Sequence, residues 1–117
     1  MIPRSISAAF PADVRQRGDE YFSSRRVTIS RADPPSLTAL VRGTTGYVVK
    51  VHAHPHVILG GCTCPYAGDN GVCKHQWATL RQADADGALS PPAPRELSDV
   101  ASYNEYRMLS WSLALTW

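Results

Sequence analysis

Apolar and polar residues alternate along the middle of the chain, as expected of strands that are buried on one face. The alternating segments are rich in β-branched residues and lie at Val27 to Ala32, Leu37 to Arg42, Tyr47 to Ala53 and Val57 to Cys62. A period of two places every second side chain on the same face of a sheet. Proline, glycine and aspartate separate the segments, which is typical of turns between strands. The pattern therefore predicts an antiparallel meander of four short strands.

Two segments that flank this sheet have helical spacing. Apolar or small residues recur every three or four positions at Phe10, Val14, Gly18 and Tyr21 or Phe22. Pro11 suits a first helical position, so we expect a helix from about 11 to 24. A second helix is expected from the sequence KHQWATLRQADA, which ends just before Gly87, a residue suited to a helix C-terminus. The predicted fold class is α+β, a small antiparallel β-meander with flanking helices.

The remainder of the chain divides into a linker and an apolar tail. We expect one domain over residues 1–87, a proline-rich linker over 88–97 and a short aromatic tail over 98–117. Ser98 and Asp99 can cap a helix, which favours a helix over 98–108. Apolar and small polar residues alternate over 109–117, so a helix and a strand both stay open for that segment. An apolar end of this kind should pack on the domain or contact a protein partner.

Composition is that of a small globular protein, with 44% hydrophobic and 19% charged residues in 117. A domain of this size obtains limited stability from its hydrophobic core alone. No segment approaches the roughly 20 apolar residues of a membrane-spanning helix. The start, MIPRSISAAFPAD, is too polar and too interrupted for a secretory leader. We therefore expect a cytoplasmic protein that does not enter a membrane.

Four metal-ligating residues lie close together in the sequence, at Cys62, Cys64, Cys73 and His75. Three thiolates and one imidazole form a closed tetrahedral ligand set for zinc, with no position left for a catalytic water. Alternate residues on a strand share a face, so the first two cysteines can point at one ion. The same spacing in the second pair requires Cys73 to precede a helix that carries His75 in its first turn. The sequence predicts one structural Zn²⁺.

The connection between the two ligand pairs contains turn-forming residues, at Pro65, Gly68, Asp69, Asn70 and Gly71. A disulfide and buried free thiols are the alternative interpretations of the cysteines. The chain has three cysteines, an odd number, and no secretory leader is recognisable, so a disulfide framework is disfavoured.

The segment GCTCPYAGDNGVCKHQW resembles the SWIM zinc finger, whose signature is Cys-x-Cys, a variable spacer and Cys-x-His. Pro65 and Lys74 are typical of bacterial members, as is a preceding helix containing RGDEYF followed by strands. The similarity covers roughly residues 8–86. It implies a small, stand-alone ββα-like structural zinc finger with a role in DNA binding or protein–protein contact. Such fingers often occur in chains related to chromatin-remodelling ATPases or Mutator-type transposases.

Positive charge is concentrated in the first two thirds of the chain. Residues 1–81 contain ten Lys or Arg and five acidic residues, whereas residues 82–117 contain two and five. This imbalance favours a nucleic-acid partner. The resemblance to SWIM fingers implies that this partner is DNA more than RNA. The candidate phosphate contacts are Arg15, Arg17, Arg25, Arg26, Arg31, Arg42, Lys74 and Arg81.

Four of these cations stand out as nucleic-acid contacts. Lys74 lies between two metal ligands at a helix start, where backbone N–H groups also favour an anion. Arg81 follows two helical turns later and can project from the same face. Arg25 and Arg26 are adjacent at the end of the first predicted helix. Any one of these arginines taken alone is better explained as an ordinary solvated surface residue.

His52, His54 and His56 alternate along a predicted strand and form a second possible metal site. Pro55 interrupts that strand, so exposed strand and turn histidines are the preferred interpretation. No P-loop and no nucleophile–base pair is recognisable, which disfavours an enzyme or a small-molecule substrate. The favoured function is a zinc-binding module that acts as a nucleic-acid-binding accessory protein. The alternative is a protein-interaction adaptor that uses the aromatic tail and the finger surface.

Overall fold

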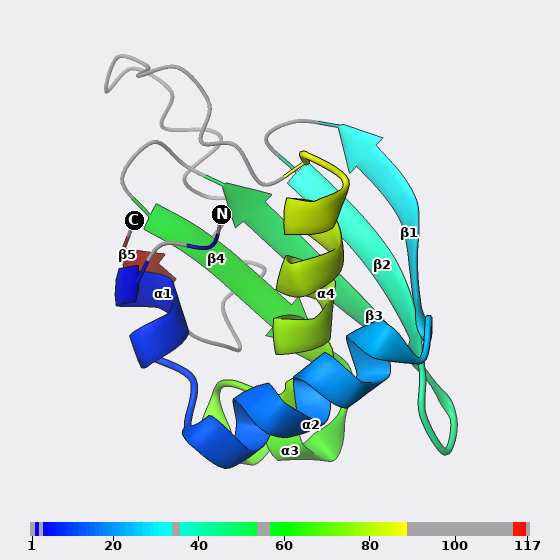
Figure 1. Ribbon diagram of the computed structural model, residues 1–117, viewed down its shortest axis with the longest axis horizontal. Coiled ribbons are helices and arrows are strands. Elements are labelled where there is room, and N and C mark those ends of the chain that lie inside the picture. Colours follow the sequence, from blue (N-terminus) through cyan, green and yellow to red (C-terminus); the bar gives the residue numbers. More distant parts are fainter. Residues whose placement is uncertain (1, 3, 34–35, 54–56, 89–113, 117) are drawn as a thin grey trace.

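The computed structural model describes residues 2, 4–33, 36–53, 57–88 and 114–116. These residues form one antiparallel sheet with helices, in which every strand pairs with the next along the chain (Figure 1). The strands are β1 (Val27–Asp33), β2 (Ser36–Arg42), β3 (Gly46–Ala53), β4 (Val57–Cys62) and β5 (Ala114–Thr116). The helices are α1 (Arg4–Ala8), α2 (Ala12–Ser23), α3 (Pro65–Asn70) and α4 (Lys74–Ala85). The predicted α+β fold with a four-stranded meander is confirmed.

The core lies between one face of the sheet and helix α4. The inward positions of β2 and β3 alternate with exposed ones and carry Leu37, Ala39, Val41, Val49 and Val51, each 6% exposed or less. Helix α4 crosses this face in contact with β1 to β4, and α2 packs against α4 near its N-terminal end (Figure 1). The sheet and α2 together bury seven of the twelve residues of α4.

The opposite face of the sheet carries the outward positions of the same strands. Lys50 is exposed there, and Leu40 is 47% exposed. Both alternate with the buried residues that face α4, so their side chains point away from the helices. Both residues are suitable control positions for substitutions on the helical side of the molecule, because they lie on the opposite face of the sheet.

The structure contains two short helices that the sequence pattern did not predict. Helix α3 occupies the connection that was expected to be a series of turns. Its N-cap is Cys64, whose sulfur accepts a hydrogen bond from Ala67 N–H at 3.4 Å, and Pro65 occupies the first turn. Helix α1 buries Ile6 completely but is too short to show a helical period. Helix α3 therefore forms because Cys64 caps it, and α1 forms because Ile6 is buried against the rest of the domain.

The chain end described by the structure pairs with the sheet. Strand β5 runs antiparallel to β4, with Leu115 opposite Ile58. The strand alternative for this part of 109–117 is therefore the one observed. The expected linker and the favoured helix over 98–108 lie outside the described residues, except Ala88, which follows the end of α4.

Helix α2 ends in a Schellman motif with an arginine at the left-handed position. Arg26 N–H donates to Tyr21 O at 3.1 Å, and Arg25 N–H donates to Phe22 O at 3.1 Å. Arg25 has a φ of 56°, whereas the same motif at the end of α4 uses Gly87, with a φ of 71°. A non-glycine residue in this conformation costs about 1 kcal/mol relative to glycine. Arg25 is thus a candidate for a role other than stability.

Candidate metal centre

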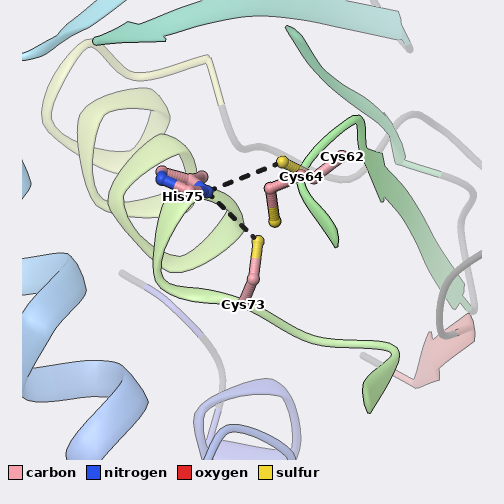
Figure 2. Close-up of side chains that lie close together, drawn as sticks. All are labelled: Cys62, Cys64, Cys73 and His75. Atoms are coloured by element: carbon pink, nitrogen blue, oxygen red, sulfur yellow. Dashed lines mark hydrogen bonds between the residues drawn. The ribbon is translucent and has the colours of Figure 1, made fainter. Parts of the chain in front are cut away.

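Three consecutive elements bring the four predicted ligands to one place (Figure 2). Cys62 is the last residue of β4, and Cys64 is the N-cap of α3. Cys73 is the N-cap of α4, and His75 lies in the first turn of that helix. In Figure 2 the three sulfurs and the imidazole converge on a common centre. The structure therefore joins the end of the meander to the start of α4 through this cluster.

The distances among the ligand atoms fit a single tetrahedral metal ion. The three Sγ atoms and the imidazole nitrogen all lie within 4.8 Å of one another. His75 Nδ1 is 3.8 Å from Cys62 Sγ and 3.8 Å from Cys73 Sγ. Metal–sulfur and metal–nitrogen bonds of about 2.3 and about 2.0 Å place such atoms about 3.6 Å apart in a tetrahedron. The four residues can hold a metal ion with only small side-chain adjustments.

The four ligand side chains are buried, so the charge state of the three thiols depends on whether a cation is present. None of the four side chains is more than 5% exposed. Hydrogen bonding from the Cys73 thiol, with His75, lowers the pKa of Cys62. Desolvation raises the pKa of Cys64, and the hydrogen bond to Cys62 together with burial raises that of Cys73. The protein groups alone thus favour one thiolate, and a divalent cation supplies the charge that stabilises all three.

Backbone and side-chain hydrogen bonds hold the ligands in place. Gln76 Oε1 accepts from the backbone N–H of Cys73 at 3.1 Å, which completes a capping box at the start of α4. Thr79 Oγ1 donates to the carbonyl of His75 at 2.8 Å. Since Ala67 N–H bonds to Cys64, each end of the ligand set is fixed by its own helix start. Such second interactions orient metal ligands and raise affinity.

The imidazole of His75 packs between two tyrosines that sequence analysis did not connect with the site. Its ring centroid lies 4.4 Å from that of Tyr47, with planes 30° apart, and 5.3 Å from that of Tyr21, edge to face. Nδ1 points to the sulfurs, and buried Nε2 has no hydrogen-bond partner among the described residues. The sequence carries no signal that these rings contact one another. The only hint is that Tyr47 lies two residues from Val49 on β3 and so faces the same, inward side of the sheet.

Among the predicted cations, Lys74 and Arg26 meet at one aromatic ring. Lys74 Nζ lies 5.1 Å, and Arg26 Cζ 5.2 Å, from the centroid of Tyr21. Arg25 lies just beyond Ser24, the C-cap of α2, and is exposed. We call Tyr21, Arg25, Arg26 and Lys74 the Tyr21 patch. The patch adjoins the metal cluster, because Tyr21 also contacts His75.

Arg81 lies apart from the Tyr21 patch and is neutralised. Its Nη1 is 2.6 Å from Asp19 Oδ1, and its Cζ lies 4.8 Å from the Phe22 ring centroid. The same carboxylate oxygen accepts from Trp77 Nε1 at 2.8 Å. Arg81 therefore joins α4 to α2, a contact that sequence spacing could not indicate. Its charge is less available to a phosphate than that of Lys74.

His52 belongs to the sheet and not to the metal cluster. It is 4% exposed, and its Nδ1 lies 2.8 Å from Ser36 Oγ, its cross-strand partner. The expectation of an exposed strand histidine was wrong at this position, because the His52 side chain is buried and hydrogen-bonded to Ser36 of β2. His54 and His56 lie outside the described residues. The second possible metal site thus receives no support from His52.

Comparison with protein-family models, curated proteins and solved structures found no match to this chain. The resemblance to SWIM fingers accordingly rests on the ligand spacing and the adjoining residues. In the part of the chain that the structure describes, no helix is long and apolar enough to cross a membrane.

Proposed function

We propose that this chain is a SWIM-type zinc-binding module whose single structural Zn²⁺ joins β4 to α4, and which binds nucleic acid, preferentially DNA, as a cytoplasmic accessory protein. The observation that carries the proposal is the convergence of four buried ligand atoms within 4.8 Å of one another. Three thiolates with one imidazole in tetrahedral arrangement are typical of structural zinc. The closed ligand set leaves no position for a reacting water, which supports a non-catalytic role.

The nucleic-acid part of the proposal is supported by the Tyr21 patch. Lys74 lies at the N-terminus of α4, where unpaired backbone N–H groups add to its attraction for an anion. Arg26 flanks the same ring, and Arg25 occupies a conformation that glycine would adopt at lower cost. The presence of an arginine at this position is explained if its charge contacts a phosphate. The adaptor alternative has less support, because β5 of the tail pairs with β4 of its own sheet.

Zinc content tests the first part of the proposal. Purified protein is expected to contain about one zinc per chain by elemental analysis, as a closed four-ligand site requires. Cys62→Ser and Cys73→Ser should abolish the bound zinc, since a missing thiolate opens the tetrahedron. The matched control is His54→Ala with His56→Ala, which removes the alternative histidine cluster and should retain full zinc. Full zinc in both cysteine variants would contradict the assignment.

The salt dependence of DNA binding tests the second part. Replacing Arg26 and Lys74 with alanine removes two cations from one ring, and the slope of log affinity against log salt should fall by about 1.8 for duplex DNA. Lys50→Ala is the control, because Lys50 lies on the opposite face of the sheet and is the only other lysine. Fluorescence anisotropy at several salt concentrations measures the slopes. An unchanged slope in the double variant, or an equal loss with Lys50→Ala, would disprove this surface.

Arg25→Gly distinguishes an effect on DNA binding from an effect on folding, when it is measured in the same salt titration. Glycine relieves the left-handed strain, so thermal stability should stay equal or rise while DNA affinity falls. A variant that is more stable but binds less cannot owe its weaker binding to unfolding. If Arg25→Gly binds as the parent does, Arg25 is not a phosphate contact.

A further inference from the structure

A pocket opens beside the metal cluster, where three helices meet. Its volume is about 70 Å³, and its lining is mainly apolar. Asp13, Val14 and Arg17 of α2 form one wall, Tyr66 of α3 forms another, and the segment Cys73–His75 closes it. Tyr66 is 48% exposed, so its ring stands at the entrance. An exposed aromatic ring beside an apolar pocket favours a planar ligand that can stack on it.

The pocket and the Tyr21 patch form one continuous surface through Lys74. This residue lines the pocket, and its ammonium group lies over Tyr21. Arg17 and Tyr21 are four residues apart on α2 and therefore occupy the same side of the helix. From Arg17 to Ser23, the last residue of α2, the helix rises about 9 Å, and Arg25 follows two residues later. The surface thus carries a row of positive charge next to an apolar pocket.

The charges along this surface point to an anionic chain. Four cations, Arg17, Arg25, Arg26 and Lys74, lie along it, and Asp13 is the acidic residue that lines the pocket. Single-stranded nucleic acid combines both required properties, since its phosphates follow a basic groove and its bases stack on aromatic side chains. A duplex keeps its bases stacked inside and cannot fill the pocket.

We propose that this pocket receives one unstacked base of a single-stranded nucleic acid, with Tyr66 stacking on the base and Arg17 and Lys74 contacting the flanking phosphates. The inference rests on the proposed nucleic-acid function and specifies its ligand. A volume of about 70 Å³ holds roughly five to seven water-sized groups, which fits a pyrimidine ring better than a purine. Asp13 can accept a hydrogen bond from the amino group of cytosine, which thymine lacks. The expected order of affinity is oligodeoxycytidine, then oligothymidine, then oligodeoxyadenosine.

Fluorescence anisotropy with the zinc-loaded full chain tests this order. The probes are labelled oligodeoxycytidine, oligothymidine and oligodeoxyadenosine of equal length, an RNA counterpart of the first, and a mixed-sequence duplex. Tyr66→Ala should weaken oligodeoxycytidine binding about tenfold through lost stacking and leave duplex binding unchanged. Tyr66→Phe keeps the ring and should bind as the parent does. Leu40→Ala is the control, because Leu40 is equally exposed but on the opposite face of the sheet.

Asp13→Ala tests the preference among pyrimidines. Affinity for oligodeoxycytidine should fall to that for oligothymidine, because the acceptor for the amino group is lost. Zinc content and circular dichroism establish that each variant is folded. Tighter binding to the duplex than to single strands, or full oligodeoxycytidine affinity in Tyr66→Ala, would overturn the pocket assignment while leaving the proposed function in place. Absence of binding to every probe at low salt would overturn both.

Discussion

Removal of zinc is expected to unfold the domain or to leave only its meander partly ordered. The metal ligands lie on β4, α3 and α4, and α4 covers the core face of the sheet. Structural zinc in small fingers supplies about 10–16 kcal/mol of apparent binding free energy at neutral pH. Whole domains are stable by only about 5–15 kcal/mol, so the loss is comparable with the entire free energy of unfolding. Three buried thiols without a cation would in addition leave the cluster poorly satisfied.

Far-UV circular dichroism and thermal melting with and without a strong chelator measure this dependence. Chelated protein should lose helical signal and cooperative melting, and added zinc should restore both. Hydrogen exchange should increase first at the amide of Ala67, which donates to Cys64 Sγ, and at the amide of Cys73, which donates to Gln76 Oε1 next to the cluster. An unchanged melting curve after zinc removal, verified by elemental analysis, would show that the metal does not support the fold.

Gly18→Ala is expected to be the most damaging single-methyl change in the described structure. A Cβ at Gly18 would lie 2.5 Å from Trp77 Cδ1 and 2.8 Å from the carbonyl oxygen of Lys74. A backbone carbonyl cannot move aside, so α2 must shift away from α4. That shift disturbs the bond from Trp77 to Asp19 and the ring contact with Phe10. We expect a loss of about 2–3 kcal/mol despite the higher helix propensity of alanine.

Gly68→Ala is the matched control for this substitution. Gly68 also lies in a helix, but a Cβ there meets no atom within 4 Å. The only expected effect of Gly68→Ala is then the higher helix propensity of alanine, so the free energy of unfolding should stay equal or rise by up to about 1 kcal/mol. Thermal melting of the zinc-loaded proteins should show Gly18→Ala lower by roughly 10 °C or more. Equal melting temperatures for Gly18→Ala and the parent would mean that α2 and α4 are not packed this closely.

The strands, the two longer helices and the ligand set could be predicted from the sequence because each leaves a local pattern. The alternation of β2, for example, reproduces the buried positions of Leu37, Ala39 and Val41. The spacing of Cys73 with His75 required a helix start, and the structure has it. The spacing of Cys62 with Cys64 predicted a shared strand, whereas β4 ends at Cys62 and Cys64 keeps an extended backbone as the N-cap of α3. Periodicity and short ligand spacing depend only on neighbouring residues, which is why these predictions succeeded.

Tertiary structure alone decided which of these elements meet. Arg81 pairs with Asp19, and His75 packs on Tyr21 and Tyr47, although these partners are far apart in the sequence. Strand β5 likewise pairs with β4 across a long intervening segment. Such contacts depend on how helices and strands pack, and a single sequence carries no periodic trace of them. The sequence therefore determined the metal ligands and the elements that hold them, whereas packing of α2 on α4 determined which cations remain available around the site.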